Sequence, residues 1–241
     1  MAKHYRKELI SLGENCEPDF KIRKFDRNAK SYAYSWAAIH DRGLFLASLS
    51  DLDGLLEGEV TKEKSAIVEF SHYQAAFHLR PQYIDETDVV PEEGLKELMA
   101  REKHLIEKTK RLYEDEGADV CFLQAVKSLG FEEDAAYVSA LSKHLFSLCR
   151  SPKVLLVLVF EEKGLKIAPY KKMETERVKI RFVHRFAEPK DRGDLYGWLA
   201  ILKEFGAGST LRYIYSDSPI CRFLFRPFVT LRHALKKRRN L

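Results

Sequence analysis

Apolar positions recur along this chain at two different periods, which together predict strands that alternate with helices. Short apolar runs predict strands, and apolar side chains spaced three or four residues apart predict amphipathic helices. The predicted strands cover residues 9–12, 66–70, 73–79, 118–123 and 154–160. The predicted helices cover residues 39–56, 91–116, 132–149 and 194–205, with a shorter helix that begins after residue 16.

Four further stretches have weaker patterns. Residues 31–36 fit a strand or an extended loop, and residues 58–64 are rich in charge, which predicts a loop. Residues 165–168 and 178–183 alternate apolar with charged side chains, which predicts partly exposed strands.

The order of these elements predicts the fold class. Residues 154–160 are consecutively apolar, as expected for a strand covered by helices on both faces. Residues 1–217 are therefore predicted to form one α/β domain, a three-layer sandwich with a mostly parallel central sheet. Ligands of such folds bind beyond the carboxyl ends of the strands, where we expect Cys16 and Gln124 to lie.

Cys16 has the sequence context of a reactive thiol. The first strand runs into Gly13, Glu14 and Asn15, which favour a tight turn, and Pro18 suits the first turn of a following helix. A helix N-terminus lowers the pKa of a cysteine, so that the thiolate forms near neutral pH. The alternative is a buried cysteine that acts as a small apolar residue at the end of a strand.

The same stretch resembles a known family. Residues 10–16 (I-S-L-G-E-N-C), 22–25 (I-R-K-F) and 31–36 (S-Y-A-Y-S-W) resemble an uncharacterised bacterial family described as papain-like cysteine peptidases. Its members carry S-L-G-x-N-C, a basic amphipathic helix and a P-F-D-W tetrad. Here the tetrad is A-Y-S-W at residues 33–36, without the proline and the aspartate. If that aspartate orients the catalytic base, the resemblance implies a weakened or inactive enzyme.

The turn at residues 13–16 is also similar to that of a capsule-polysaccharide family described as coenzyme A-binding acyltransferases. Weaker similarity to the peptidase family continues through residues 76–78, where the family carries a histidine, and through the basic helix at residues 101–112. The two resemblances imply a cysteine-dependent hydrolase or acyltransferase of cell-envelope or capsule polysaccharide metabolism. They also imply a coenzyme A thioester as an acyl donor, although no cofactor is certain.

A nucleophilic cysteine needs a base within hydrogen-bond reach and donors for the oxyanion. His78 closes a predicted strand and matches the histidine of the resembled family, so it ranks first as the base. His40 precedes Asp41, which would orient it, and ranks second, with His72 third. The expected substrate-binding residues are Gly13, Asn15 and Trp36, and the expected substrate is a small molecule, a glycan or a peptide.

A second hypothesis comes from the missing aspartate before Trp36. It makes the chain a non-catalytic binding module of polysaccharide biosynthesis, in which the turn at residues 13–16 binds an anionic group. No metal site is predicted, because the chain has no H-E-x-x-H motif and no paired C-x-x-C. Basic residues on the helix at residues 91–116 fit a solvated face better than an anion site.

Charge changes this picture only at the C-terminal end. Residues 218–241 hold seven of the 41 Lys and Arg residues and no acidic one, which leaves 34 basic against 36 acidic residues elsewhere. The tail combines these charges with Phe and Leu, which predicts an amphipathic segment on an anionic membrane surface. The alternative is that Phe223, Leu224 and Phe228 complete the domain core. Nucleic acid is not expected as a partner, because no aromatic stacking platform accompanies the charges.

The cysteines and the N-terminus predict the compartment. Cys16, Cys121, Cys149 and Cys221 are widely scattered, which does not fit a disulfide framework. The N-terminal residues lack the apolar core of a signal peptide. We therefore expect a cytoplasmic protein that lies peripherally on the inner face of the membrane. Cys121 and Cys149 fall in apolar settings and are expected to be inert.

Overall fold

The computed structural model describes most of the chain up to the end of the last helix. The described residues are 8–13, 17–25, 29–35, 37–63, 67–79, 91–186 and 194–205. Cys16, Asn15, Trp36 and the predicted membrane-binding tail at residues 218–241 lie outside them.

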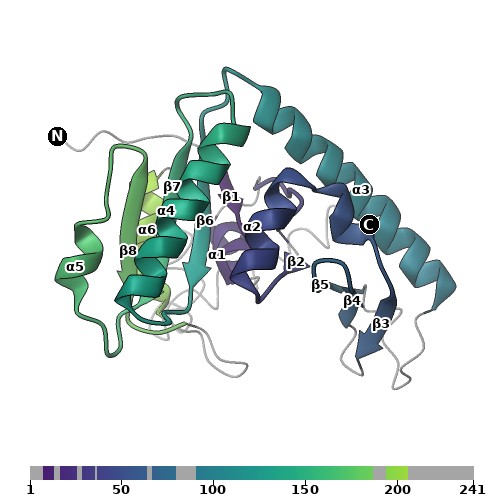
Figure 1. The fold of residues 1–241 in the computed structure, drawn as a ribbon, viewed down its shortest axis with the longest axis horizontal. Helices are drawn as coiled ribbons and strands as arrows, with labels where there is room; N and C mark the ends of the chain where they lie inside the picture. Colours follow the sequence, from purple (N-terminus) through teal and green to yellow (C-terminus); the bar gives the residue numbers. More distant parts are fainter. Residues whose placement is uncertain are drawn as a thin grey trace, which may run out of the picture.

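Four strands form a parallel sheet, which lies in the left part of Figure 1. The order is β1 (Glu8–Ser11), β6 (Val120–Val126), β7 (Leu155–Glu161) and β8 (Val178–Val183), and each neighbouring pair is parallel. Parallel strands need crossover connections, and helices supply them here. The predicted α/β class and parallel sheet are confirmed.

Helices cover both faces of this sheet, because its side chains alternate between two apolar layers. Phe122 and Leu158 face the layer of α3 (Glu92–Glu114), α4 (Phe131–Leu148) and α5 (Ile167–Lys171). Leu123 and Val157 face the opposite layer, which α1 (Glu17–Phe25) and α6 (Leu195–Phe205) cover. With both faces buried, the three-layer arrangement accounts for the continuous apolar run in β7.

A second sheet lies beyond β1, and it is antiparallel. Its order is β2 (Ala37–Ala38), β5 (Ala75–His78), β4 (Ile67–Phe70) and β3 (Val60–Glu63). The prediction of a loop at residues 58–64 is therefore wrong for residues 60–63, which form β3. Its backbone pairs with β4 as an edge strand, and an edge strand can carry charged side chains because one of its sides faces water.

The prediction of a strand at residues 165–168 is also wrong, because the helix α5 begins at Ile167. Four alternating residues fit either period, and the partners of Tyr170 decide between them. The Tyr170 ring packs against Phe160 at a centroid distance of 5.1 Å and against Phe182 at 6.1 Å. A helical turn brings that ring into the core.

The remaining predicted helices are close to those observed. The segment 39–56 contains α2 (Arg42–Ser50) and a short 3-10 helix, η1 (Asp53–Leu56), with Asp51 between them. Residues 32–35 form a turn rather than a strand, closed by a bond from the Ser35 N–H to the Tyr32 carbonyl. No helix in the described ranges has the length and apolar character of a membrane span.

Candidate active site

The turn after β1 packs against the segment that carries the second motif of the sequence. A methyl group built on Gly13 would lie 2.2 Å from the Ala37 carbonyl oxygen and 3.1 Å from that of Tyr34. Only glycine allows two backbones to approach this closely. Gly13 and the segment 34–37 therefore lie side by side, so the end of β1 packs against the backbone on both sides of position 36.

The turn at residues 31–35 is held from two helices. Thr109 of α3 accepts the Ala33 N–H at 3.0 Å, and Lys108 donates to the Ser31 carbonyl at 2.8 Å. On the other side, the Tyr34 hydroxyl shares a hydrogen bond of 2.9 Å with Ser48 of α2. These bonds fix the segment that precedes Trp36 in the chain.

A buried carboxyl group of α1 lies beside the same turn. Asp19 accepts a bond of 2.5 Å from Arg23 Nε, Arg23 also bonds to Ser31, and the Ser35 side chain lies beside the Asp19 carboxyl group. Burial raises the pKa of Asp19, and Arg23 and Ser35 partly oppose that rise. Ser35 occupies the position of the aspartate in the resembled tetrad. The Asp19 carboxyl group of α1 lies beside Ser35.

His78, the first-ranked base, is the last residue of β5 and is exposed. Its neighbour Phe77 is the Cα partner of Ala37, whose carbonyl touches Gly13. Arg101 donates to the His78 carbonyl at 3.3 Å. His78 is thus one strand away from the segment that packs on the Gly13 turn.

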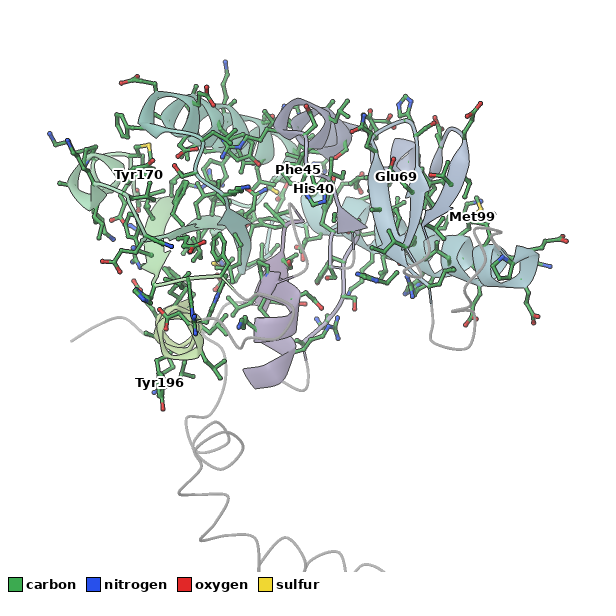
Figure 2. All side chains as sticks on the ribbon, turned by 90° about the horizontal axis from the view of Figure 1, so that it is seen from below. His40, Phe45, Glu69, Met99, Tyr170 and Tyr196 are labelled. Carbon is green, nitrogen blue, oxygen red and sulfur yellow. The ribbon has the colours of Figure 1, made fainter. Side chains whose placement is uncertain are left out.

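His40, ranked second, lies over the carboxyl edge of the parallel sheet. Residues 37–42 lead from Ala37, which touches the end of β1, to Arg42, which donates to the Lys127 carbonyl after β6 at 2.7 Å. The strands point downward in Figure 1, and Figure 2, seen from below, shows His40 between the two sheets. Asp41 caps α2 by accepting the Leu44 N–H at 2.8 Å, so this oxygen is already engaged.

The two candidate bases lie at different ends of the β2–β5 pairing. The strands are antiparallel, so the chain from Ala37 to His40 runs away from His78. Along the strand direction the two histidines are separated by on the order of 10 Å. A single cysteine can therefore have only one of the two histidines within hydrogen-bond reach.

The other described histidines are engaged elsewhere or solvated. His72 lies in the turn before β5, with its ring against Tyr73 and its Nε2 3.8 Å from Asp51. His144 Nε2 shares a hydrogen bond of 2.5 Å with Ser50, and His104 is exposed on α3.

Sequence reasoning missed a polar cluster at the end of β6. Asp134 is fully buried and accepts bonds from Arg42 at 2.9 Å, Ser128 at 2.5 Å and Tyr170 at 2.8 Å. The signal was the acidic run at residues 132–134, which a helix dipole explains equally well. The cluster ties α2, α5 and the β6–α4 loop together.

Gln124 does not lie at the edge of the sheet as predicted. The strand β6 continues to Val126, and Gln124 is fully buried within it. Its side-chain amide donates to the Tyr137 hydroxyl at 2.8 Å. This contact gives Gln124 a structural role.

The two described cysteines are buried. Cys121 is fully buried in β6, and burial raises the pKa of Cys149 to about 12. At neutral pH the Cys149 thiol is therefore expected to stay protonated, and burial makes both thiols hard to reach. Their settings agree with the expected lack of reactivity.

The basic residues of α3 make internal contacts. Arg101 bonds to Glu102, Lys108 lies 3.8 Å from the centre of the Tyr32 ring, and Lys110 bonds to Asp53. These contacts favour a structural role over anion binding.

Within the described ranges, no group of three or more His, Cys, Asp or Glu side chains is arranged to hold a metal ion. Comparisons of the chain with protein-family models, with curated proteins and with solved structures give no significant match. The family resemblance of residues 10–36 therefore stays a prediction.

Proposed function

We propose that this chain is a cysteine-dependent enzyme that transfers or hydrolyses an acyl group, with Cys16 as the nucleophile. The observation that carries this proposal is the contact of Gly13 with the carbonyl groups of Tyr34 and Ala37. It supports a site in which the turn before α1, the segment around Trp36 and one histidine surround the same substrate.

The proposed reaction has two steps. The Cys16 thiolate attacks the carbonyl carbon of an ester, thioester or amide, and the backbone N–H groups of the turn stabilise the oxyanion together with Asn15. The protonated histidine gives its proton to the leaving group, and an acyl-enzyme remains. Water, or a sugar hydroxyl, then gives its proton to the histidine and releases the acyl group from sulfur.

The proposed biological setting is cell-envelope or capsule polysaccharide metabolism, with a coenzyme A thioester as one source of the acyl group. The tail at residues 218–241 would hold the enzyme at an anionic membrane surface. A binding module is the second candidate function, and Ser35 in place of the tetrad's aspartate favours it. Asp19 weakens this argument for a binding module, because its carboxyl group lies beside Ser35.

Thiol labelling tests the nucleophile. Under limited iodoacetamide at pH 7 we expect Cys16 to react at least tenfold faster than Cys121 and Cys149, because alkylation requires an accessible thiolate. Peptide mass spectrometry of the full chain gives the three rates, and the urea-unfolded chain, where all thiols are accessible, is the control. Faster labelling of Cys121 or Cys149 in the folded chain would refute the proposed role of Cys16.

Histidine variants identify the base. We expect either His78→Gln or His40→Gln, and not both, to slow Cys16 alkylation at pH 7 about tenfold, since an imidazolium beside the sulfur stabilises the thiolate. His72→Gln is the matched control and should leave the rate unchanged. If neither variant changes the rate or its pH profile, the binding module becomes the better description.

A further inference from the structure

The strand β8 is an edge strand of the parallel sheet. In the part of the chain that the structure describes, it pairs with β7 on one side and with no strand on the other. The Leu156 N–H of β7 donates to the carbonyl of Arg177, the residue before β8, at 2.9 Å. Backbone groups alternate in direction along a strand, so those of Val178 and Ile180 point away from β7. A row of outward backbone groups is a template on which another strand can pair.

Both outward groups of Ile180 are bonded to side chains of one short segment. The Ile180 N–H donates to Glu174 Oε1 at 3.0 Å, and the Ile180 carbonyl accepts from Lys171 Nζ at 2.7 Å. In an antiparallel pair of strands, a single residue of the neighbouring strand exchanges both of these bonds. Glu174 and Lys171 therefore supply together the acceptor and the donor that an additional strand would supply.

Val178 is bonded in the same way by Thr175. The Thr175 hydroxyl oxygen accepts the Val178 N–H at 3.0 Å, and the Thr175 N–H donates to the Val178 carbonyl at 3.0 Å. The residues that close these two successive positions lie at the end of α5 and directly after it. We call Lys171, Glu174 and Thr175 the edge strap.

Further bonds hold the edge strap in place. Glu174 Oε1 also accepts from Arg181 Nη1 at 2.6 Å and from Lys171 Nζ at 3.2 Å. Burial raises the pKa of Glu174, but the Ile180 N–H, Lys171 and Arg181 lower it by more, so this pKa lies below its ordinary value. Glu174 is therefore charged at neutral pH, and hydrogen bonds to a charged group are stronger than those between neutral groups.

We infer that the edge strap prevents β8 of one copy of the chain from pairing with β8 of a second copy. The two strands would pair antiparallel about a twofold axis with Ile180 opposite Ile180, because each residue then exchanges both outward bonds with its own copy. Lys179 would lie opposite Arg181, and this like-charge pair weakens the contact without blocking the backbone groups. The inference does not depend on Cys16 or on the proposed chemistry.

A double variant, Lys171→Ala with Glu174→Ala, removes both side chains that bond to Ile180. In dilute protein we expect the Ile180 amide to exchange its hydrogen about tenfold faster than in the wild type, because it loses its acceptor. In concentrated protein at high salt, which screens Lys179 and Arg181, we expect the double variant to sediment with twice the mass of the wild type. The Ile180 amide should then be protected again. Hydrogen exchange followed by NMR and sedimentation velocity on the full chain give these readouts.

Two controls separate the strap from a general change of charge. Lys172→Ala with Glu176→Ala removes the same two charges from exposed neighbours and should behave as the wild type. Glu174→Gln keeps an oxygen that can accept the Ile180 N–H and should keep the wild-type mass. The single variant Glu174→Ala leaves Lys171 on the Ile180 carbonyl, and it replaces the double variant if circular dichroism shows that the latter is unfolded.

Three results would overturn the inference. The first is an Ile180 amide that exchanges as slowly in the double variant as in the wild type, since the edge strap would then not cover this edge. The second is faster exchange without any increase in mass, which would mean that an open edge does not pair. The third is a larger species in which exchange at Ile180 does not slow with protein concentration, because the copies would then associate through another surface.

Discussion

Replacing Gly13 by alanine is expected to lower the free energy of unfolding by about 3 kcal/mol, the upper part of the usual range for overpacking. The added methyl group would lie 2.2 Å from the Ala37 carbonyl oxygen, far inside van der Waals contact. The atoms that it meets belong to backbone at Ala37 and Tyr34, so no side-chain rotation relieves the clash. The segment 34–37 has to move away from the end of β1.

Urea unfolding followed by circular dichroism measures this loss, and Gly164→Ala provides the control. Gly164 has a φ of +80° and nothing within 4 Å of an added methyl group. Alanine there is therefore destabilising only because a residue with a Cβ atom disfavours the left-handed backbone conformation. That cost is about 1 kcal/mol. A loss for Gly13→Ala no larger than the loss for Gly164→Ala would contradict the close packing of the two motif segments.

The displacement in Gly13→Ala should also reach the candidate site. If residues 34–37 help to form it, the pH profile of Cys16 alkylation should shift to that of an ordinary thiol, with an apparent pKa of about 8.5, even at a temperature where the variant stays folded. A variant that is destabilised but keeps the wild-type alkylation profile would separate the packing of Gly13 from the chemistry of Cys16.

Replacing Asp134 by asparagine is expected to destabilise the fold by a similar amount, about 3 kcal/mol, because it leaves a charge without its partner. Asp134 is fully buried, and the Arg42 side chain is only 15% exposed. An asparagine amide offers one acceptor oxygen where the carboxylate has two. Either Arg42 or the hydroxyl groups of Ser128 and Tyr170 then lose their acceptor.

Tyr170→Phe is the matched control for Asp134→Asn. It removes one hydroxyl group from the same cluster and keeps the charge pair, so the expected loss is about 1 kcal/mol. Thermal and urea unfolding of both variants compare the two losses. Equal losses would mean that the pair of Arg42 and Asp134 adds nothing beyond an ordinary hydrogen bond.

How far the sequence predicts this fold depends on how regular each pattern is. The long helices α3 and α4 and the strand β7 follow from their periods, because each pattern extends over two or more turns or over a continuous run. The second sheet was not predicted as a separate unit. The sequence predicted β4 and β5 as strands, but it missed β2 and β3, whose two and four residues are too few for a period to be distinguished from a loop.

The candidate site follows the same division. Sequence spacing alone placed Gly13 at the end of a strand and before a helix, and the structure has β1 and α1 on the two sides of it. The sequence also ranked His78 and His40 as candidate bases, but it did not show which element of the fold lies beside each histidine. That depends on the pairing of β2 with β5 and on the bond from Arg42 to Lys127.

The sequence by itself determined the α/β class, the parallel sheet and the position of Cys16 between a strand and a helix. These properties are local, since they come from hydrophobic period and turn-forming residues. Only the tertiary structure decided that Asp19 meets Ser35 and that Asp134 joins three elements. Such contacts join residues far apart in the chain, and their energy depends on burial that no local pattern encodes.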